Sequence, residues 1–281
     1  KTVEVEKTVV VQATPVVSKY KLAVVLPGVI TDADYNTLGY LAGLAVQKDM
    51  GIPMAYSESV AVPDVERVMR EYVDSGYNII FAHGGQFISQ TIALAKQFQD
   101  VIFICEGDAE QQGLPANFWF IDRNFQTASY VMGYIAARTT KTGKIGYLAG
   151  LKMPFTFQEY HAVEQAIKDN NLTVEIKKIW TGDFNDPTKA RQVADTMISE
   201  NVDVIMGSLN LGMFGVFEAA KAAKGTNPVL VTAKYTDKTS FAPNNYLTSS
   251  LYDFAGPLEN MVKRAQEGVM GGYYPMTYGD G

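Results

Sequence analysis

Two acids, a tyrosine and an amide stand within five positions, Asp32 to Asn36, shortly after the apolar run that ends at Pro27-Gly28. Asp32 and Asp34 occupy alternate positions of an extended loop, so their carboxylates could face the same way and act as an acid and base pair. Such a pair needs neighbours that separate the two pKa values, and neither acid has one. Loop acids before a helix more often cap its N-terminus. We therefore interpret Asp34 as a cap and keep a ligand role open for Asp32.

The residues that usually catalyse reactions or bind metals do not have the spacing that either role requires. The only histidines, His83 and His161, lie in different halves, without HExxH or paired cysteines, so we expect no metal. "TKTGKIG" lacks the glycine spacing and Ser/Thr of a P-loop, and "GSLNLG" is not a nucleophile elbow. The single cysteine, Cys105, stands in the apolar run "VIFIC", which is typical of a buried thiol. We predict neither an enzyme nor a cofactor.

Aromatic and amide side chains gather in the loops that follow the apolar runs. The candidate residues of this kind are Tyr35, Asn36, Gln86, Phe87, Phe155, Asn210, Tyr235, Tyr252 and Phe254. Flat rings stack on a flat ligand, and amides or carboxylates select its edge through hydrogen bonds. These loops therefore indicate a binding site for a flat heterocycle.

The elements that must position these loops follow from the hydrophobic pattern. Short apolar runs such as "YNIIFAHG" and "DVIFICEG" are separated by stretches of helical period such as "PDVERVMREYVDSG". This alternation predicts parallel βαβ units, and it restarts at "TGKIGYLAG", which makes two similar halves. We expect two doubly wound α/β lobes. Sheets of this kind bind ligands at the carboxyl ends of their strands, where the loops named above converge.

Length, composition and charge agree with this architecture. The 281 residues are 47% hydrophobic, enough for a sizeable core, and the net charge of -6 gives no basic surface for nucleic acid. No apolar run reaches the roughly 18–20 residues of a membrane span. We expect a tether at 1–19, a first lobe from 20–123 plus 253–281, and a second from 124–252. The tether and the missing initiator Met predict a signal peptide or anchor upstream.

Three stretches carry a family resemblance, namely "KTGKIGYLAGLKMP", "WTGDFNDPTKARQVADTMISENVDVIM" and "GVFEAAKAAKG". They resemble the basic membrane protein family, the purine-nucleoside-type substrate-binding lipoproteins of ABC importers. The similarity runs from about Lys21 to the end, and "SFAPNNYLTS" with Gly256-Pro257 resembles the branch that binds adenine or related nucleobases. The resemblance implies two lobes of the type I periplasmic binding protein kind, closing on a ligand without chemistry. It also implies a permease partner and a lipid anchor on an upstream cysteine.

The resemblance also assigns roles to single residues. Tyr35 matches the aromatic that stacks on the base, Asn36 its polar neighbour and Asp32 the acid of the same loop, while Phe87 falls on a phenylalanine after the third strand. Nucleoside-binding members hold the ribose with an Asp in a "GVDSDQ"-like segment and a Lys in a "TSMVK"-like segment. Here those segments read "AKYTD" and "TSSLY". Tyr235 and Tyr252 take the two places, which counts against a ribose.

We therefore interpret the chain as a monomeric, extracytoplasmic solute-binding protein that delivers a purine-like heterocycle to an ABC permease. Tyr35 with Phe87 or Phe254 would stack on it. The edge would be read by Asp32, Asn36 and either Asp237 or Asp253. A nucleoside or flavin ligand stays open within the family. A nucleoside hydrolase and a sensor that docks on a receptor are the alternatives of other classes.

Overall fold

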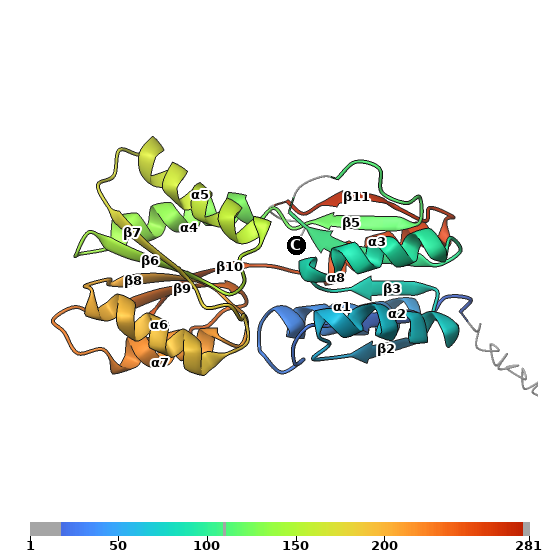
Figure 1. Cartoon of the computed structure of the whole chain (residues 1–281), viewed down its shortest axis with the longest axis horizontal. Helices are drawn as coiled ribbons and strands as arrows, with labels where there is room; N and C mark the ends of the chain where they lie inside the picture. Colours follow the sequence, from blue (N-terminus) through green and yellow to red (C-terminus); the bar gives the residue numbers. More distant parts are fainter. Residues whose placement is uncertain (1–17, 109–110, 278–281) are drawn as a thin grey trace, which may run out of the picture.

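A computed structural model describes residues 18–108 and 111–277 of the chain. It contains two parallel sheets, each with helices on both faces, and these sheets form two lobes side by side (Figure 1). The six-stranded sheet has the order β11 (Gly272–Pro275), β5 (Phe118–Asp122), β4 (Ile102–Gly107), β3 (Ile79–Ala82), β1 (Leu22–Val25), β2 (Met54–Ser57). The five-stranded sheet has the order β10 (Tyr246–Leu251), β9 (Leu230–Tyr235), β8 (Val204–Ser208), β6 (Lys144–Ala149), β7 (Glu175–Trp180). The predicted fold class is confirmed.

The first lobe is built on the six-stranded sheet. Its helices are α1 (Tyr35–Met50), η1 (Val62–Asp64), α2 (Val65–Asp74), η2 (Gly85–Phe87), α3 (Ile88–Gln97) and α8 (Ala255–Gln266). Strand β1 is buried on both faces, as is typical of a parallel sheet. Leu22 and Val24 pack in the core that α1 and α8 share, whereas Ala23 and Val25 pack on the face of α2 and α3. The two faces of this sheet therefore hold separate cores.

The second lobe has the same architecture as the first, with helices on both faces of a parallel sheet. Its helices are α4 (Phe125–Thr139), α5 (Pro154–Asp169), α6 (Pro187–Ser199) and α7 (Met213–Ala222). Helices α4 and α5 pair on one face of the five-stranded sheet, and α6 and α7 pair on the other (Figure 1). Helix α6 begins as its sequence predicts, with Pro187 in its first turn and the Asp186 carboxylate accepting from the Lys189 N–H.

The chain passes from the first lobe to the second between β5 and α4 and returns between β10 and α8 (Figure 1). In both sheets the strands are all parallel, so their carboxyl ends point the same way within each sheet. The loops at these ends meet between the lobes, and some of the candidate residues are found there. In the part of the chain that the structure describes, no helix has the length and apolar character needed to cross a membrane.

Candidate ligand-binding cleft

Helix α1 has Asp34 at its N-cap position, but its free N–H groups are capped by Asp32. Its carboxylate accepts the backbone N–H groups of Asp34, Asn36 and Thr37 at 2.9–3.0 Å. The Asn36 amide and the Thr37 hydroxyl also donate to it, and the Asn36 oxygen accepts the Gly28 N–H at 2.9 Å. The prediction of Asp34 as the cap is therefore correct for its position and wrong for its side chain, which makes no capping hydrogen bond. The polar atoms of Asp32 and Asn36 hold the loop in shape, which leaves them little capacity to read a ligand.

Asp34 is buried and lies against the second lobe. One carboxylate oxygen is 3.3 Å from the Lys238 ammonium, and the other has no hydrogen-bond partner among the described residues. Burial raises the pKa of Asp34 well above its usual value, with Lys238 opposing the shift and Asp32 adding to it. An unsatisfied buried oxygen costs free energy, so this acid needs a functional explanation.

Tyr35 is fixed at both ends by a buried network in the first lobe. Its ring stacks on His83 at a centroid distance of 3.9 Å, and its hydroxyl donates to Glu106. The His83 Nε2 lies 2.8 Å from the Tyr35 carbonyl oxygen, and Nδ1 faces the other Glu106 oxygen. Because a carbonyl only accepts, Nε2 carries the proton of that bond. The network holds the ring in one orientation at the cleft.

Arg123, which the sequence analysis missed, is a buried cation directly after β5. Its guanidinium pairs with Asp108 and lies 3.8 Å from Glu106. It also lies 4.4 Å from the centroid of the Phe125 ring and 4.8 Å from that of Phe155. The group therefore joins an acidic wall of the first lobe to aromatic rings of the second. A charged residue next to the buried run "FWFID" is unusual, and this feature of the sequence could have identified Arg123 as a candidate site residue.

Lys234 is a second missed cation, at the end of β9. It pairs with Glu159 of α5, which also accepts the Tyr147 hydroxyl at 2.8 Å. Its ammonium lies 3.5 Å from the centroid of the Phe125 ring. Burial lowers the pKa of Lys234, and Glu159 opposes that shift. Phe125 thus lies next to one cation from each lobe.

Four of the predicted aromatic residues converge between the lobes. The Tyr35 ring lies 5.2 Å from the Tyr235 ring and meets Phe254 edge-on at 5.8 Å. Tyr252 lies 5.8 Å from Tyr235 and 6.5 Å from Phe254. They stand at or just after the ends of β1, β9 and β10, so the structure brings these predicted residues together.

Other predicted site residues lie elsewhere. Phe87 is fully buried in the core under α2 and α3, because the η2 turn directs its ring away from the cleft. Asp237 and Asp253 are exposed, and they accept from the backbone of Thr239 and Ala255 two residues on. These contacts are local turns rather than parts of a cleft. Asn210 is buried after β8, where its backbone N–H donates to Phe184 at 3.0 Å.

Both lobes line a cavity of about 350 Å³. Its lining includes Gln86, Glu106, Asp108 and Arg123 from the first lobe and Met153, Pro154, Phe155 and Gln158 from the second. Of the predicted residues, Gln86 and Phe155 line this cavity. Gln158, which the sequence analysis missed, has a buried side-chain oxygen without a partner among the described residues. The volume lies in the lower part of the usual range for ligand pockets, about 300–1,000 Å³.

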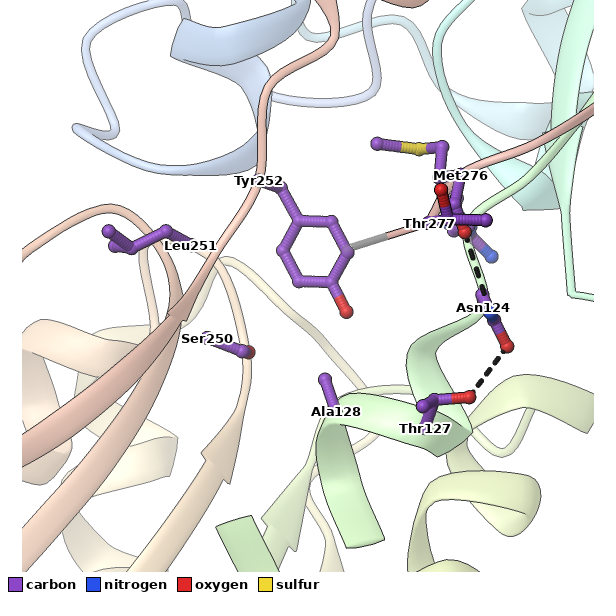
Figure 2. Close-up of a pocket in the computed structure, with 9 residues that line it drawn as sticks. Asn124, Thr127, Ala128, Ser250, Leu251, Tyr252, Met276 and Thr277 are labelled. Carbon is purple, nitrogen blue, oxygen red and sulfur yellow. Dashed lines mark hydrogen bonds between the residues drawn. The ribbon is translucent and has the colours of Figure 1, made fainter. Parts of the chain in front are cut away.

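A smaller pocket of about 60 Å³ lies where the chain crosses between the lobes (Figure 2). Tyr252 points into it from the returning segment, and Asn124 and Thr127 border it from the start of α4. The Asn124 amide donates to the Met276 carbonyl at 3.4 Å and accepts the Thr127 hydroxyl at 2.8 Å. This space is too small for a heterocycle. The described residues also contain no group of three or more His, Cys, Asp or Glu placed to hold a metal.

The profile of the Bmp family, described as ABC transporter substrate-binding protein PnrA-like, matches residues 19–274. Basic membrane protein A2 of Borrelia garinii subsp. bavariensis is 27% identical over 237 residues, covering 83% of this chain and 68% of that protein. Basic membrane protein D of Borreliella burgdorferi is 24% identical over 263 residues, covering 92% and 75%. A solute-binding protein of an ABC transporter system from Aeropyrum pernix K1 has a similar fold, with a TM-score of 0.83 at 20% identity, covering 93% of this chain and 75% of that one.

Proposed function

Because the chain belongs to the Bmp family of PnrA-like ABC transporter substrate-binding proteins, we propose that it binds a purine-like heterocycle, preferably a free base such as adenine. Membership of the family confirms the resemblance drawn from the sequence. The proposed ligand lies in the cleft between the lobes, and its proposed destination is an ABC permease that meets the protein outside the cytoplasm. The single observation that carries this proposal is the cavity of about 350 Å³ that both lobes line.

The lining of that cavity suits a flat ligand with hydrogen-bonding edges. Phe155 and the planar Arg123 guanidinium offer flat surfaces, and rings and guanidinium groups both stack on aromatic faces. Gln86 and Gln158 present amides, which pair with the donor and acceptor sites of adenine in a bidentate way. The unpartnered oxygen of Gln158 supports this role, since a ligand donor would satisfy it.

The two tyrosines favour a base over a nucleoside. Tyr235 is 5% exposed and packs between Tyr35 and Tyr252, so its ring fills space next to the cleft. Neither tyrosine can supply the charged partners that the ribose hydroxyls have in nucleoside-binding relatives. Leaving a buried hydroxyl unpaired costs about 1–3 kcal/mol.

The hydrolase alternative loses support at Asp32. An acid and base pair would need both carboxylates free to exchange protons, but Asp32 is surrounded by the N–H groups of α1 and by two side-chain donors. Binding without chemistry is therefore the function that the site supports best.

Calorimetry with adenine and adenosine tests the ligand. The protein is first unfolded and refolded to remove bound small molecules. We expect adenine to bind at least about tenfold more tightly than adenosine, which corresponds to roughly 1.4 kcal/mol. Equal affinity would reject the argument from the tyrosines, and absence of binding by either would reject the purine class.

Gln158→Leu tests the site, because it removes the amide and keeps the volume. We expect adenine affinity to fall by about 5- to 150-fold, the effect of leaving 1–3 kcal/mol of hydrogen bonding unmade. Asp237→Ala serves as the control, since this exposed acid lies outside the cavity lining and should leave the affinity unchanged. If Asp237→Ala weakened adenine binding and Gln158→Leu did not, the binding site would lie outside this cavity.

A further inference from the structure

One backbone carbonyl in the first lobe receives two donors from the second. The Ala33 oxygen, just before α1, accepts the Thr236 hydroxyl at 2.7 Å and the Lys238 ammonium at 2.6 Å. The same ammonium lies 3.3 Å from the Asp34 carboxylate. The loop before α1 and the loop after β9 are therefore joined by two hydrogen bonds and an ion pair.

The two charged side chains of these contacts are buried. The Lys238 and Asp34 side chains are 2% and 1% exposed. Removing an ammonium and a carboxylate from water is costly, and the cost is offset only while the partners stay together. Separation of the lobes would return both groups to water, so this contact belongs to the closed arrangement alone.

Both loops are strained where they meet. Ala33 has φ of 54° and Tyr235 has φ of 73°, values that residues other than glycine, asparagine and aspartate rarely adopt. At Tyr235 the Thr236 N–H also donates to the Lys234 carbonyl at 2.9 Å, which closes a γ-turn of the rare, strained form. Strain of this kind persists only where surrounding contacts hold it, and it often marks moving parts.

We propose that Ala33 and Asp34 of the first lobe and Thr236 and Lys238 of the second form a latch that holds the lobes closed against the strain at Ala33 and Tyr235. The latch adjoins the aromatic rings on both sides, because Tyr35 follows Asp34 and Tyr235 precedes Thr236. Its closure therefore brings together two rings of the cleft, and its release lets both strained residues relax. The inference concerns the motion of the lobes and does not depend on the identity of the ligand.

Distance measurements between spin labels test the latch. Labels are attached at Lys96→Cys on α3 and Lys168→Cys on α5, two exposed positions in different lobes, while the native Cys105 is buried. Pulsed electron resonance then gives the populations of closed and open forms in the full chain without added ligand. The latch is broken by Thr236→Val together with Asp34→Asn and Lys238→Met, which keep the side-chain volumes and leave no buried charge unpaired.

We expect the ratio of closed to open molecules to fall by about fivefold or more in this variant, the effect of losing two net hydrogen bonds. Thr239→Val is the matched control: it changes an exposed threonine of the same loop and should leave the ratio unchanged. Circular dichroism checks that every variant is folded. Identical distance distributions in variant and wild type would overturn the latch, and so would a wild type with no closed population.

Discussion

Replacing Lys234 with methionine should lower the free energy of unfolding by about 3–5 kcal/mol, because it leaves Glu159 buried without its cation. The Glu159 side chain is 1% exposed, so bulk water does not reach its carboxylate. The Tyr147 hydroxyl would still donate to it at 2.8 Å, which offsets part of the loss. The cation also leaves the face of Phe125, a contact worth about 1–2 kcal/mol when desolvated.

Urea denaturation at pH 7 measures this change, since the free energy of unfolding falls linearly with denaturant. Glu159→Gln with Lys234→Met removes both charges and keeps a partner for Tyr147. We expect this pair to lose no more than about 1 kcal/mol, so the coupling between the two positions should be large. Lys221→Met is the control, because the pair that Lys221 forms with Glu218 on α7 is exposed and should contribute little.

A loss below about 1 kcal/mol in Lys234→Met would refute the reasoning, since a pair so weakly coupled must be hydrated. A double variant as unstable as Lys234→Met alone would also refute the argument from charge. It would mean that the packing of the lysine stem, rather than its charge, stabilises the second lobe.

Two further predictions follow from buried groups. The pKa of Asp34 is raised, so the folded protein binds the proton of this carboxyl more tightly than the unfolded chain does. Protonation of Asp34 therefore stabilises the fold. This stabilisation is complete below about pH 4, the ordinary pKa of the group, and is lost as pH rises through the raised pKa. Urea titrations above pH 4 should therefore show wild type losing unfolding free energy relative to Asp34→Asn, and a difference independent of pH would contradict this. Burial raises the pKa of Cys105 to about 12, so iodoacetamide at pH 8 should modify it only after unfolding in urea, and rapid labelling of the native protein would count against its burial.

The fold could be predicted because its signals are local. The runs "YNIIFAHG" and "DVIFICEG" contain β3 and β4, and the helical stretch between β2 and β3 contains α2. Parallel order then fixes which loops share an edge, so the meeting of Tyr35, Tyr235, Tyr252 and Phe254 also followed from the sequence. Such inferences need only the period of the pattern and the direction of the strands.

The direction of each side chain could not be read in this way. Asp32 and Asp34 are two residues apart, and only the turn of the loop decides that Asp32 faces the free N–H groups of α1. Phe87 has the right position along the chain but the wrong side of the sheet. Gln158 lies four residues into α5, where nothing local distinguishes it from an exposed polar residue, and only the approach of the other lobe makes it part of a cavity.

The distribution of ion pairs sets the latch apart from the other buried charges of the cleft. Arg123 is balanced by Asp108 and Glu106 of its own lobe, and Lys234 by Glu159 of its own. The lobes can therefore separate without breaking either buried pair. Among the ion pairs of the described residues, the one between Asp34 and Lys238 alone joins the two lobes. Opening therefore breaks this ion pair at the contact where the backbone is strained, so small changes in these loops should shift the balance between closed and open forms.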